Sequence, residues 1–157
     1  MGEENDDKLI FAAEKKPEQP HSATLPPWKV LVVDDEESIH HITNLVLKNF
    51  TFDGRGIDIL TAYAGGEAKR ILEQQPDIAT ILLDVVMESD DAGLKVVTYL
   101  REELENSNTR IILRTGQPGI APEQQVIAQY DINDYKDKTE LTEQKLFSTI
   151  ITSLRGY

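Results

Sequence analysis

Short apolar runs alternate with amphipathic stretches of helical length over most of the chain. The apolar runs predict strands at residues 29–33, 57–62, 78–84, 110–115 and 134–136. The stretches between them predict helices at residues 36–48, 66–74, 93–104, 121–129 and 139–154. The first, third and fourth runs are apolar at consecutive positions, which is typical of parallel strands covered on both faces. Five strand–helix units in succession predict an α/β domain with a doubly wound, five-stranded parallel sheet.

Two segments do not fit this alternation. Residues 1–27 are acidic, hold four of the seven prolines and show no sustained periodicity, so we expect a flexible leader. A single domain would then occupy residues 28–157. Residues 50–56, with glycines on either side of Arg55, predict an extended loop between the first helix and the second strand.

Composition narrows the range of functions. The formal net charge of -12 disfavours direct binding to nucleic acid, because phosphate backbones would be repelled. The chain has no cysteine, which excludes disulfides, thiolate zinc sites and thiol catalysis. No apolar run is long enough to span a bilayer and the first residues do not resemble a signal peptide, so we expect a cytoplasmic protein without membrane contact.

Charged and polar residues stand at the ends of the predicted strands. Asp34 and Asp35 follow the first strand, and Asp84 ends the third. Thr115 ends the fourth strand, and Lys138 comes just after the fifth. The carboxyl ends of parallel strands meet at one edge of the sheet, so we expect these five side chains to lie together.

Such a group suits phosphoryl transfer. Three converging carboxylates repel one another unless a cation neutralises them, and oxygen ligands suit magnesium. A lysine and a hydroxyl suit an incoming phosphoryl group, and an aspartate can act as the nucleophile. Taken singly, each residue has an ordinary explanation as a turn, a helix cap or a solvated side chain. The combination at successive strand ends is what favours the functional interpretation.

Three segments resemble the signature of the receiver domain of bacterial two-component response regulators, the CheY-like domain. They are residues 30–36 (VLVVDDE), 81–87 (ILLDVVM) and 111–116 (IILRTG). The resemblance covers about residues 28–155. It implies a flavodoxin-like (βα)5 fold with strand order 2-1-3-4-5.

The resemblance also implies a role for each site residue. Asp84 would be the phosphoacceptor and, with Asp35, a direct ligand of Mg²⁺, or alternatively Mn²⁺. Asp34 would act mostly through a metal-bound water, and the Val86 carbonyl would complete the protein ligands.

The resemblance implies a switch as well as an acceptor. The Thr115 hydroxyl would swing toward the phosphoryl group, Lys138 would bond it, and Tyr135 would be the aromatic switch. A sensor histidine kinase or a phosphotransfer protein would supply the phosphoryl group. The domain would thus be a self-phosphorylating switch without turnover of an external substrate. Its readout surface would run from Gly119 to Tyr135, where a homodimer could also form.

Three positions depart from the usual receiver pattern. Glu88 and Thr139 stand where proline is common, and Gly93 comes one residue later than usual. Thr139 could cap the last helix instead.

A narrower resemblance concerns residues 83–88, 112–119 and 130–136. They are similar to a receiver subfamily that precedes an uncharacterised middle domain and often an HD-type phosphohydrolase. An output domain in cis is therefore expected, although a stand-alone receiver stays open.

Two other classes of function share features with this pattern. A haloacid-dehalogenase-type hydrolase also uses an aspartate and magnesium, but it needs Asp-x-Asp after the first strand, a spacing that Asp34 and Asp35 lack. A pseudo-receiver that serves only for docking commonly loses members of the acidic and basic set, which is complete here.

Overall fold

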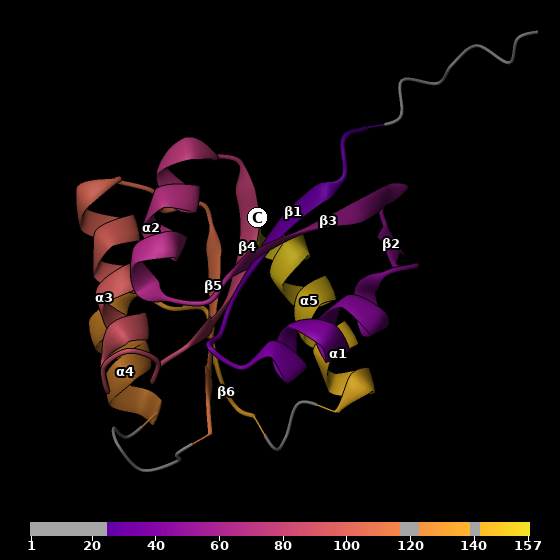
Figure 1. Ribbon diagram of the computed structural model, residues 1–157. Coiled ribbons are helices and arrows are strands. Elements are labelled where there is room, and N and C mark those ends of the chain that lie inside the picture. Colours follow the sequence, from indigo (N-terminus) through magenta and orange to yellow (C-terminus); the bar gives the residue numbers. More distant parts are fainter. Residues whose placement is uncertain (1–24, 117–122, 139–141) are drawn as a thin grey trace, which may run out of the picture.

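Six strands form one sheet, in the order β2-β3-β1-β4-β5-β6, in the computed structural model, which describes residues 25–116, 123–138 and 142–157 (Figure 1). The strands are β1 (Trp28–Val33), β2 (Thr51–Phe52), β3 (Arg55–Ala62), β4 (Ile78–Asp84), β5 (Arg110–Thr115) and β6 (Asp134–Asp137). All neighbours pair in parallel except β2, which is antiparallel to β3. Without β2 the order is 2-1-3-4-5, so the predicted flavodoxin-like fold class is confirmed.

The additional strand β2 lies where the sequence predicted only a loop. Thr51 and Phe52 pair with Gly56 and Arg55 in a short hairpin. Its turn residues, Asp53 and Gly54, have φ angles of 53° and 71°. Asp-Gly is well suited to a tight hairpin turn with positive φ at both central positions, which explains the extra strand pair.

The helices lie close to their predicted positions. They are α1 (Glu37–Leu47), α2 (Gly65–Gln74), α3 (Ala92–Thr98), α4 (Glu123–Tyr130) and α5 (Glu143–Gly156). α3 continues into a π-helical turn, η1 (Tyr99–Glu103), in which the Leu104 N–H donates to the Tyr99 carbonyl at 3.0 Å. Helices α1 and α5 cover one face of the sheet, and α2, α3 and α4 cover the other (Figure 1).

The start of the last helix differs from the prediction. α5 begins at Glu143, and the Thr142 side chain caps it by accepting a hydrogen bond from the Lys145 N–H. Residues 139–141, which include the predicted cap Thr139, lie outside the described residues, as do residues 1–24 of the expected leader.

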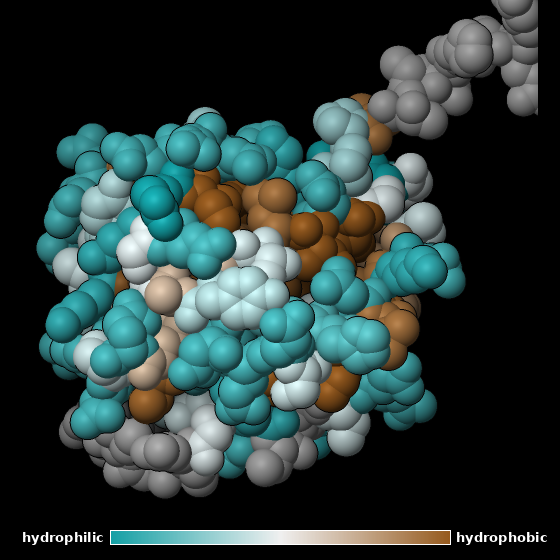
Figure 2. Space-filling model, viewed as in Figure 1, coloured by the Kyte–Doolittle hydropathy of each residue, from teal (hydrophilic) through white to brown (hydrophobic). Residues whose placement is uncertain are grey.

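Two apolar clusters, one on each face, hold the sheet in place. Alternate residues of β1 point to opposite faces, so Leu31 and Val33 join one cluster while Val30 and Val32 join the other. Every residue of β4 is buried, because this central strand is covered on both sides. In Figure 2 the surface is mostly hydrophilic, and hydrophobic atoms show between the two helix layers, where Figure 1 places β1 and β3. Among the described helices, none is long and apolar enough to cross a membrane.

Candidate functional site

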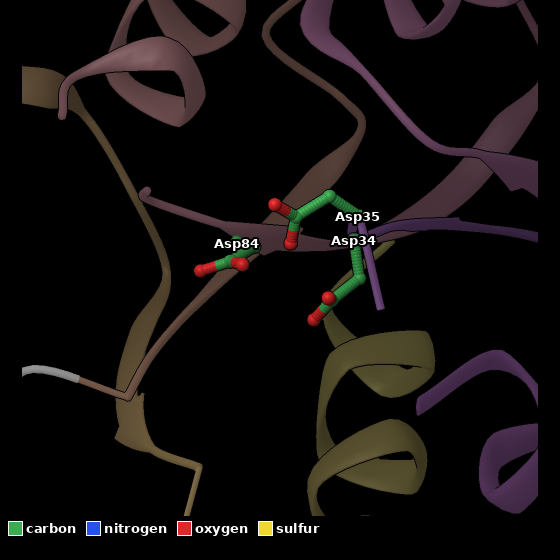
Figure 3. A group of neighbouring side chains, drawn as sticks. All are labelled: Asp34, Asp35 and Asp84. Atoms are coloured by element: carbon green, nitrogen blue, oxygen red, sulfur yellow. The ribbon is translucent and has the colours of Figure 1, made fainter. Parts of the chain in front are cut away.

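Asp34, Asp35 and Asp84 meet at the carboxyl ends of two neighbouring strands. Asp84 is the last residue of β4, and Asp34 directly follows β1, whose Val33 pairs with Leu83. Carboxylate oxygens of the three residues lie within 4.8 Å of one another (Figure 3). Asp34 and Asp84 are buried, whereas Asp35 is exposed. The predicted convergence of the three aspartates is therefore present in the structure.

Lys138 joins this acidic group from the end of β6. Its ammonium lies 2.9 Å from Asp84 Oδ2 and 3.0 Å from Asp34 Oδ2. A third carboxylate, that of the exposed Glu36, lies 3.4 Å away. The Lys138 N–H also donates to the Thr115 carbonyl at 2.8 Å, which ties the lysine backbone to the end of β5. One cation therefore bridges the two buried carboxylates.

Burial and this ion pair shift the pKa values of both partners. Burial raises the pKa of the Asp84 carboxyl, and the nearby charge of Asp34 raises it too, although the hydrogen bond from Lys138 acts in the opposite direction. Burial lowers the pKa of Lys138, but its hydrogen bonds to Asp84 and Asp34 outweigh this effect and leave the pKa above its ordinary value. The lysine thus stays charged at neutral pH, while ionised Asp84 carries a net energetic cost.

Local hydrogen bonds fix the backbone at Asp34. Its Oδ1 accepts the Glu36 N–H at 2.9 Å, at the entry to α1. His40 Nε2 lies 2.7 Å from the Asp34 carbonyl oxygen, and since that oxygen can only accept, Nε2 carries the proton. The His40 ring is buried against Tyr63, with ring centroids 4.5 Å apart. His40 therefore positions the end of β1, a role that its spacing in the sequence did not reveal.

The loop after Asp84 is anchored at two points. The Gly93 N–H donates to the Val85 carbonyl at 3.0 Å, and a methyl group on Gly93 would clash with the Asp84 carbonyl oxygen. The Glu88 side chain, where receivers usually have proline, accepts the N–H of Gly65 at 2.8 Å. A carboxylate at the first turn of α2 is electrostatically favourable, so Glu88 links this loop to a neighbouring helix.

The remaining predicted residues border the same edge. Thr115 is buried at the end of β5, and Tyr135 is half-buried in β6, against the cluster that faces α2, α3 and α4. The Val86 N–H donates to Asp84 Oδ1 at 3.3 Å, which keeps Val86 beside the acceptor carboxylate. A contact of the Val86 carbonyl with a metal, and a swing of Thr115 or Tyr135, stay predictions.

The donor set suits a hard divalent cation. All three nearby side chains are carboxylates, and the mutual repulsion of Asp34 and Asp84 is only partly offset by Lys138. The exposed Asp35 leaves one side of the group open to solvent, which suits an ion that keeps several waters. The residues present therefore fit Mg²⁺, and Mn²⁺ by the same oxygen chemistry.

Sequence comparison shows the family to which the chain belongs. The profile of the response regulator receiver domain matches residues 30–151, so the chain belongs to that family. It is 50% identical over 131 residues to the 3'3'-cGAMP-specific phosphodiesterase 2 of Vibrio cholerae, a match that covers 83% of this chain and 25% of the relative.

Two solved structures show the same architecture. A two-component system response regulator/GGDEF domain protein superposes with a TM-score of 0.67 at 26% identity, over 82% of this chain and 49% of that one. A response regulator receiver domain protein from Clostridium thermocellum gives a TM-score of 0.68 at 22% identity, over 82% and 94% of the two chains. The chain thus spans a quarter of the phosphodiesterase and about half of the GGDEF protein. It is a receiver domain of the two-component class.

Gly93→Ala tests the close approach behind Asp84. The added methyl group would lie 2.8 Å from Val85 Cα as well as against the Asp84 carbonyl, so the strand end must shift. We expect the free energy of unfolding in urea to fall by about 1–3 kcal/mol. Gly66→Ala is the matched control, because a methyl group there meets nothing within 4 Å. Equal stability of the two variants would contradict the packing described here.

Asp84→Asn tests the cost of the buried charge in protein stripped of metal by a chelator. A carboxyl whose pKa is raised by folding destabilises the protein as pH rises from its ordinary pKa of 3.8 through the higher folded pKa. The variant should therefore unfold at a higher temperature than the wild type at pH 7, and the difference should shrink toward low pH. Asp77→Asn, at the exposed start of β4, should show no such gain, because hydrogen bonding to Lys29 lowers the pKa of Asp77. A wild type as stable as Asp84→Asn at pH 7 would refute this account.

Proposed function

We propose that this domain, taken as residues 28–157, accepts a phosphoryl group on Asp84 in a reaction that requires Mg²⁺. The observation that carries the proposal is the meeting of Asp34, Asp35 and Asp84 at one sheet edge with Lys138 only 2.9 Å from the Asp84 carboxylate. An Asp84 oxygen attacks the phosphorus of a phosphohistidine or an acyl phosphate. The bond between phosphorus and the leaving group breaks, the leaving group keeps the electron pair, and an aspartyl phosphate forms.

The residues around Asp84 support this step. Lys138 already pairs with Asp84, so its ammonium can follow the developing negative charge onto a phosphoryl oxygen. Thr115 is buried at the end of β5, which pairs with β4, and would offer its hydroxyl to the phosphoryl group. The raised pKa of Asp84 reflects a carboxylate that is held in a poorly solvated position, which increases its reactivity once ionised.

Mg²⁺ or Mn²⁺ would be held by Asp35 and Asp84 directly, by Asp34 largely through a water, and by the Val86 carbonyl. When bound, the ion would neutralise the carboxylates and the charge of the transferred group. The protein residues would meanwhile orient the acceptor, through the Val86 N–H and Lys138, and fix the backbone of Asp34, through Glu36 and His40.

The switch would run through Thr115 and Tyr135. Movement of the Thr115 hydroxyl toward the phosphoryl group would leave space for Tyr135 in the adjacent strand β6, which pairs with β5. The face from Gly119 to Tyr135 is our candidate for the readout surface and for a homodimer. Within this face α4 and β6 are described, whereas residues 119–122 are not.

A sensor histidine kinase or a phosphotransfer protein would dock beside the site on α1. This helix begins just after the acidic group and exposes Ile42 and Leu45, with 54% and 63% of their surface accessible. Residues three apart on a helix share a face, so the two make an apolar contact area. A groove between α1 and α5 lies next to this area, and it is lined by Val46 and by Phe147, which is 44% exposed.

The output is proposed to be a domain in cis rather than this domain's own chemistry. The GGDEF protein and the cGAMP phosphodiesterase are both longer proteins, and this chain matches only a part of each. A cyclic-dinucleotide phosphodiesterase of HD type is the output that we favour. The receiver would itself turn over no external substrate, act in the cytoplasm, and bind neither membrane nor nucleic acid directly.

Acetyl phosphate provides the direct test of the proposed reaction. Incubation of the protein with acetyl phosphate and MgCl₂ should add one phosphate-sized increment to the intact mass, because the domain catalyses its own modification. The increment should disappear when the magnesium is chelated.

Two variants complete this test. Asp84→Asn should show no increment, whereas Asp77→Asn, just before the opposite end of β4, should behave as the wild type. A folded wild-type protein that gains no mass with donor and metal would overturn the proposal in favour of a docking module. An increment that persists in Asp84→Asn would place the acceptor elsewhere.

A further inference from the structure

A buried arginine stands beside the acidic site. Arg114 lies in β5 directly before Thr115, pairs with Asp84 across the β4–β5 register, and is only 4% exposed. Its carbonyl accepts the Val85 N–H at 3.1 Å. Its Nη2 atom is 3.9 Å from Asp34 Oδ2, the oxygen that also faces Lys138. An arginine near the end of β5, after three apolar residues, thus adds a second cation to the site.

Packing alone does not account for this side chain. Its Nε and Nη2 atoms are buried and form no hydrogen bond with any described residue. Burial lowers the pKa of Arg114, while Asp34 and Asp84 raise it, and a guanidinium stays charged in proteins. A buried charge with unused donors costs free energy, so an apolar residue would be expected here if only stability mattered.

The charge count suggests what the arginine does. Asp34, Asp35 and Asp84 carry three negative charges, and Lys138 and Arg114 carry two positive ones. The net charge of the five side chains is therefore -1, and a divalent cation changes it to +1. An aspartyl phosphate adds about one negative charge relative to the carboxylate, which returns the site close to neutrality. Glu36 is left out of this count: its carboxylate also contacts Lys138, at 3.4 Å, but its side chain is 59% exposed, so solvent screens most of its charge.

We propose that Arg114 is a buried positioning residue that sets the charge balance of this site between its metal-bound and phosphorylated states. The inference rests on the proposed function and adds a regulation of the same site. Arg114 repels the divalent cation and attracts the phosphoryl group, so its two effects have opposite signs. It acts through Asp34, whose carboxylate it faces, and its guanidinium keeps its charge on burial more reliably than an ammonium would.

Arg114→Met removes the charge and keeps an extended apolar side chain. We expect calorimetric titration with MgCl₂ to show roughly tenfold tighter binding, since one nearby positive charge is lost. At saturating MgCl₂, binding of beryllium fluoride, an anion that mimics the phosphoryl group, should become roughly tenfold weaker for the same reason. Arg114→Lys should restore both affinities toward those of the wild type.

Arg110→Met is the matched control. Arg110 lies in the same strand, four residues earlier and therefore on the same face, and its Nε is also buried without a hydrogen bond to a described residue. It stands at the end of β5 that is remote from the aspartates. Both affinities should equal those of the wild type in this variant.

The two expected changes in affinity have opposite signs, which distinguishes an electrostatic role of Arg114 from a structural one. Weaker binding of both ions by a folded Arg114→Met protein would indicate a purely structural role, and unchanged binding would indicate no role. If Arg114→Met does not fold, as judged by circular dichroism, the same two titrations are made with Arg114→Gln, for which the same changes in affinity are expected. A wild type that binds MgCl₂ but gains no phosphoryl group from acetyl phosphate would refute the proposed function, whereas the magnesium titration would still decide the role of Arg114.

Discussion

Repulsion among three aspartates at one end of the sheet is the constraint around which the rest of the site is arranged. Two of them, Asp34 and Asp84, are buried, and Lys138 lies within 3.0 Å of both. Their positions follow from the parallel pairing of β1 with β4, which brings the ends of these strands together. The central strands are covered on both faces, so the carboxylates cannot turn away without disturbing the core. The fold therefore holds three carboxylates and the Lys138 ammonium close together, where they can bind a cation and a phosphoryl group.

The supporting contacts come from α1, from the loop after β4 and from the start of α3. His40 in α1 holds the Asp34 carbonyl, and Glu88 in the loop after β4 holds the first turn of α2. Gly93 allows α3 to begin against the Asp84 carbonyl. These contacts hold the backbone around Asp34 and Asp84, whereas Thr115 and Tyr135 lie in β5 and β6. That division suits a switch in which one edge responds while the acceptor stays in place.

Much of this arrangement could be predicted from the order of residues. The strand ends are marked by charged residues that follow apolar runs, and parallel topology implies that these ends meet, so Asp34, Asp35, Asp84 and Lys138 could be grouped in advance. The hairpin of β2 was missed, although Asp53-Gly54 is a turn signal, because a two-residue strand leaves no periodicity to detect. The π-helical turn at Tyr99–Glu103 has no separate signal in a helical pattern, and α5 begins at Glu143 because Thr142 caps it, whereas the sequence pattern predicted a cap at Thr139.

Arg114 and His40 could not be predicted for a different reason. An arginine inside the run IILRT is usually taken as a strand residue that faces solvent, but Arg114 is buried and lies 3.9 Å from Asp34, just after β1. The partner of His40 is a backbone carbonyl, which has no signature in the sequence. The contact of Arg114 with Asp34 joins segments that are far apart in the sequence, whereas the contact of His40 spans only six residues.

The central claim, that Asp84 is the acceptor, is tested most directly by locating the modified residue. Borohydride reduces an aspartyl phosphate to homoserine, so the phosphorylated protein can be reduced, digested and analysed by peptide mass spectrometry. The account predicts homoserine at position 84 and unchanged aspartate at positions 34 and 35. Homoserine at another aspartate, or a phosphate on a histidine or hydroxyl that borohydride leaves intact, would contradict it.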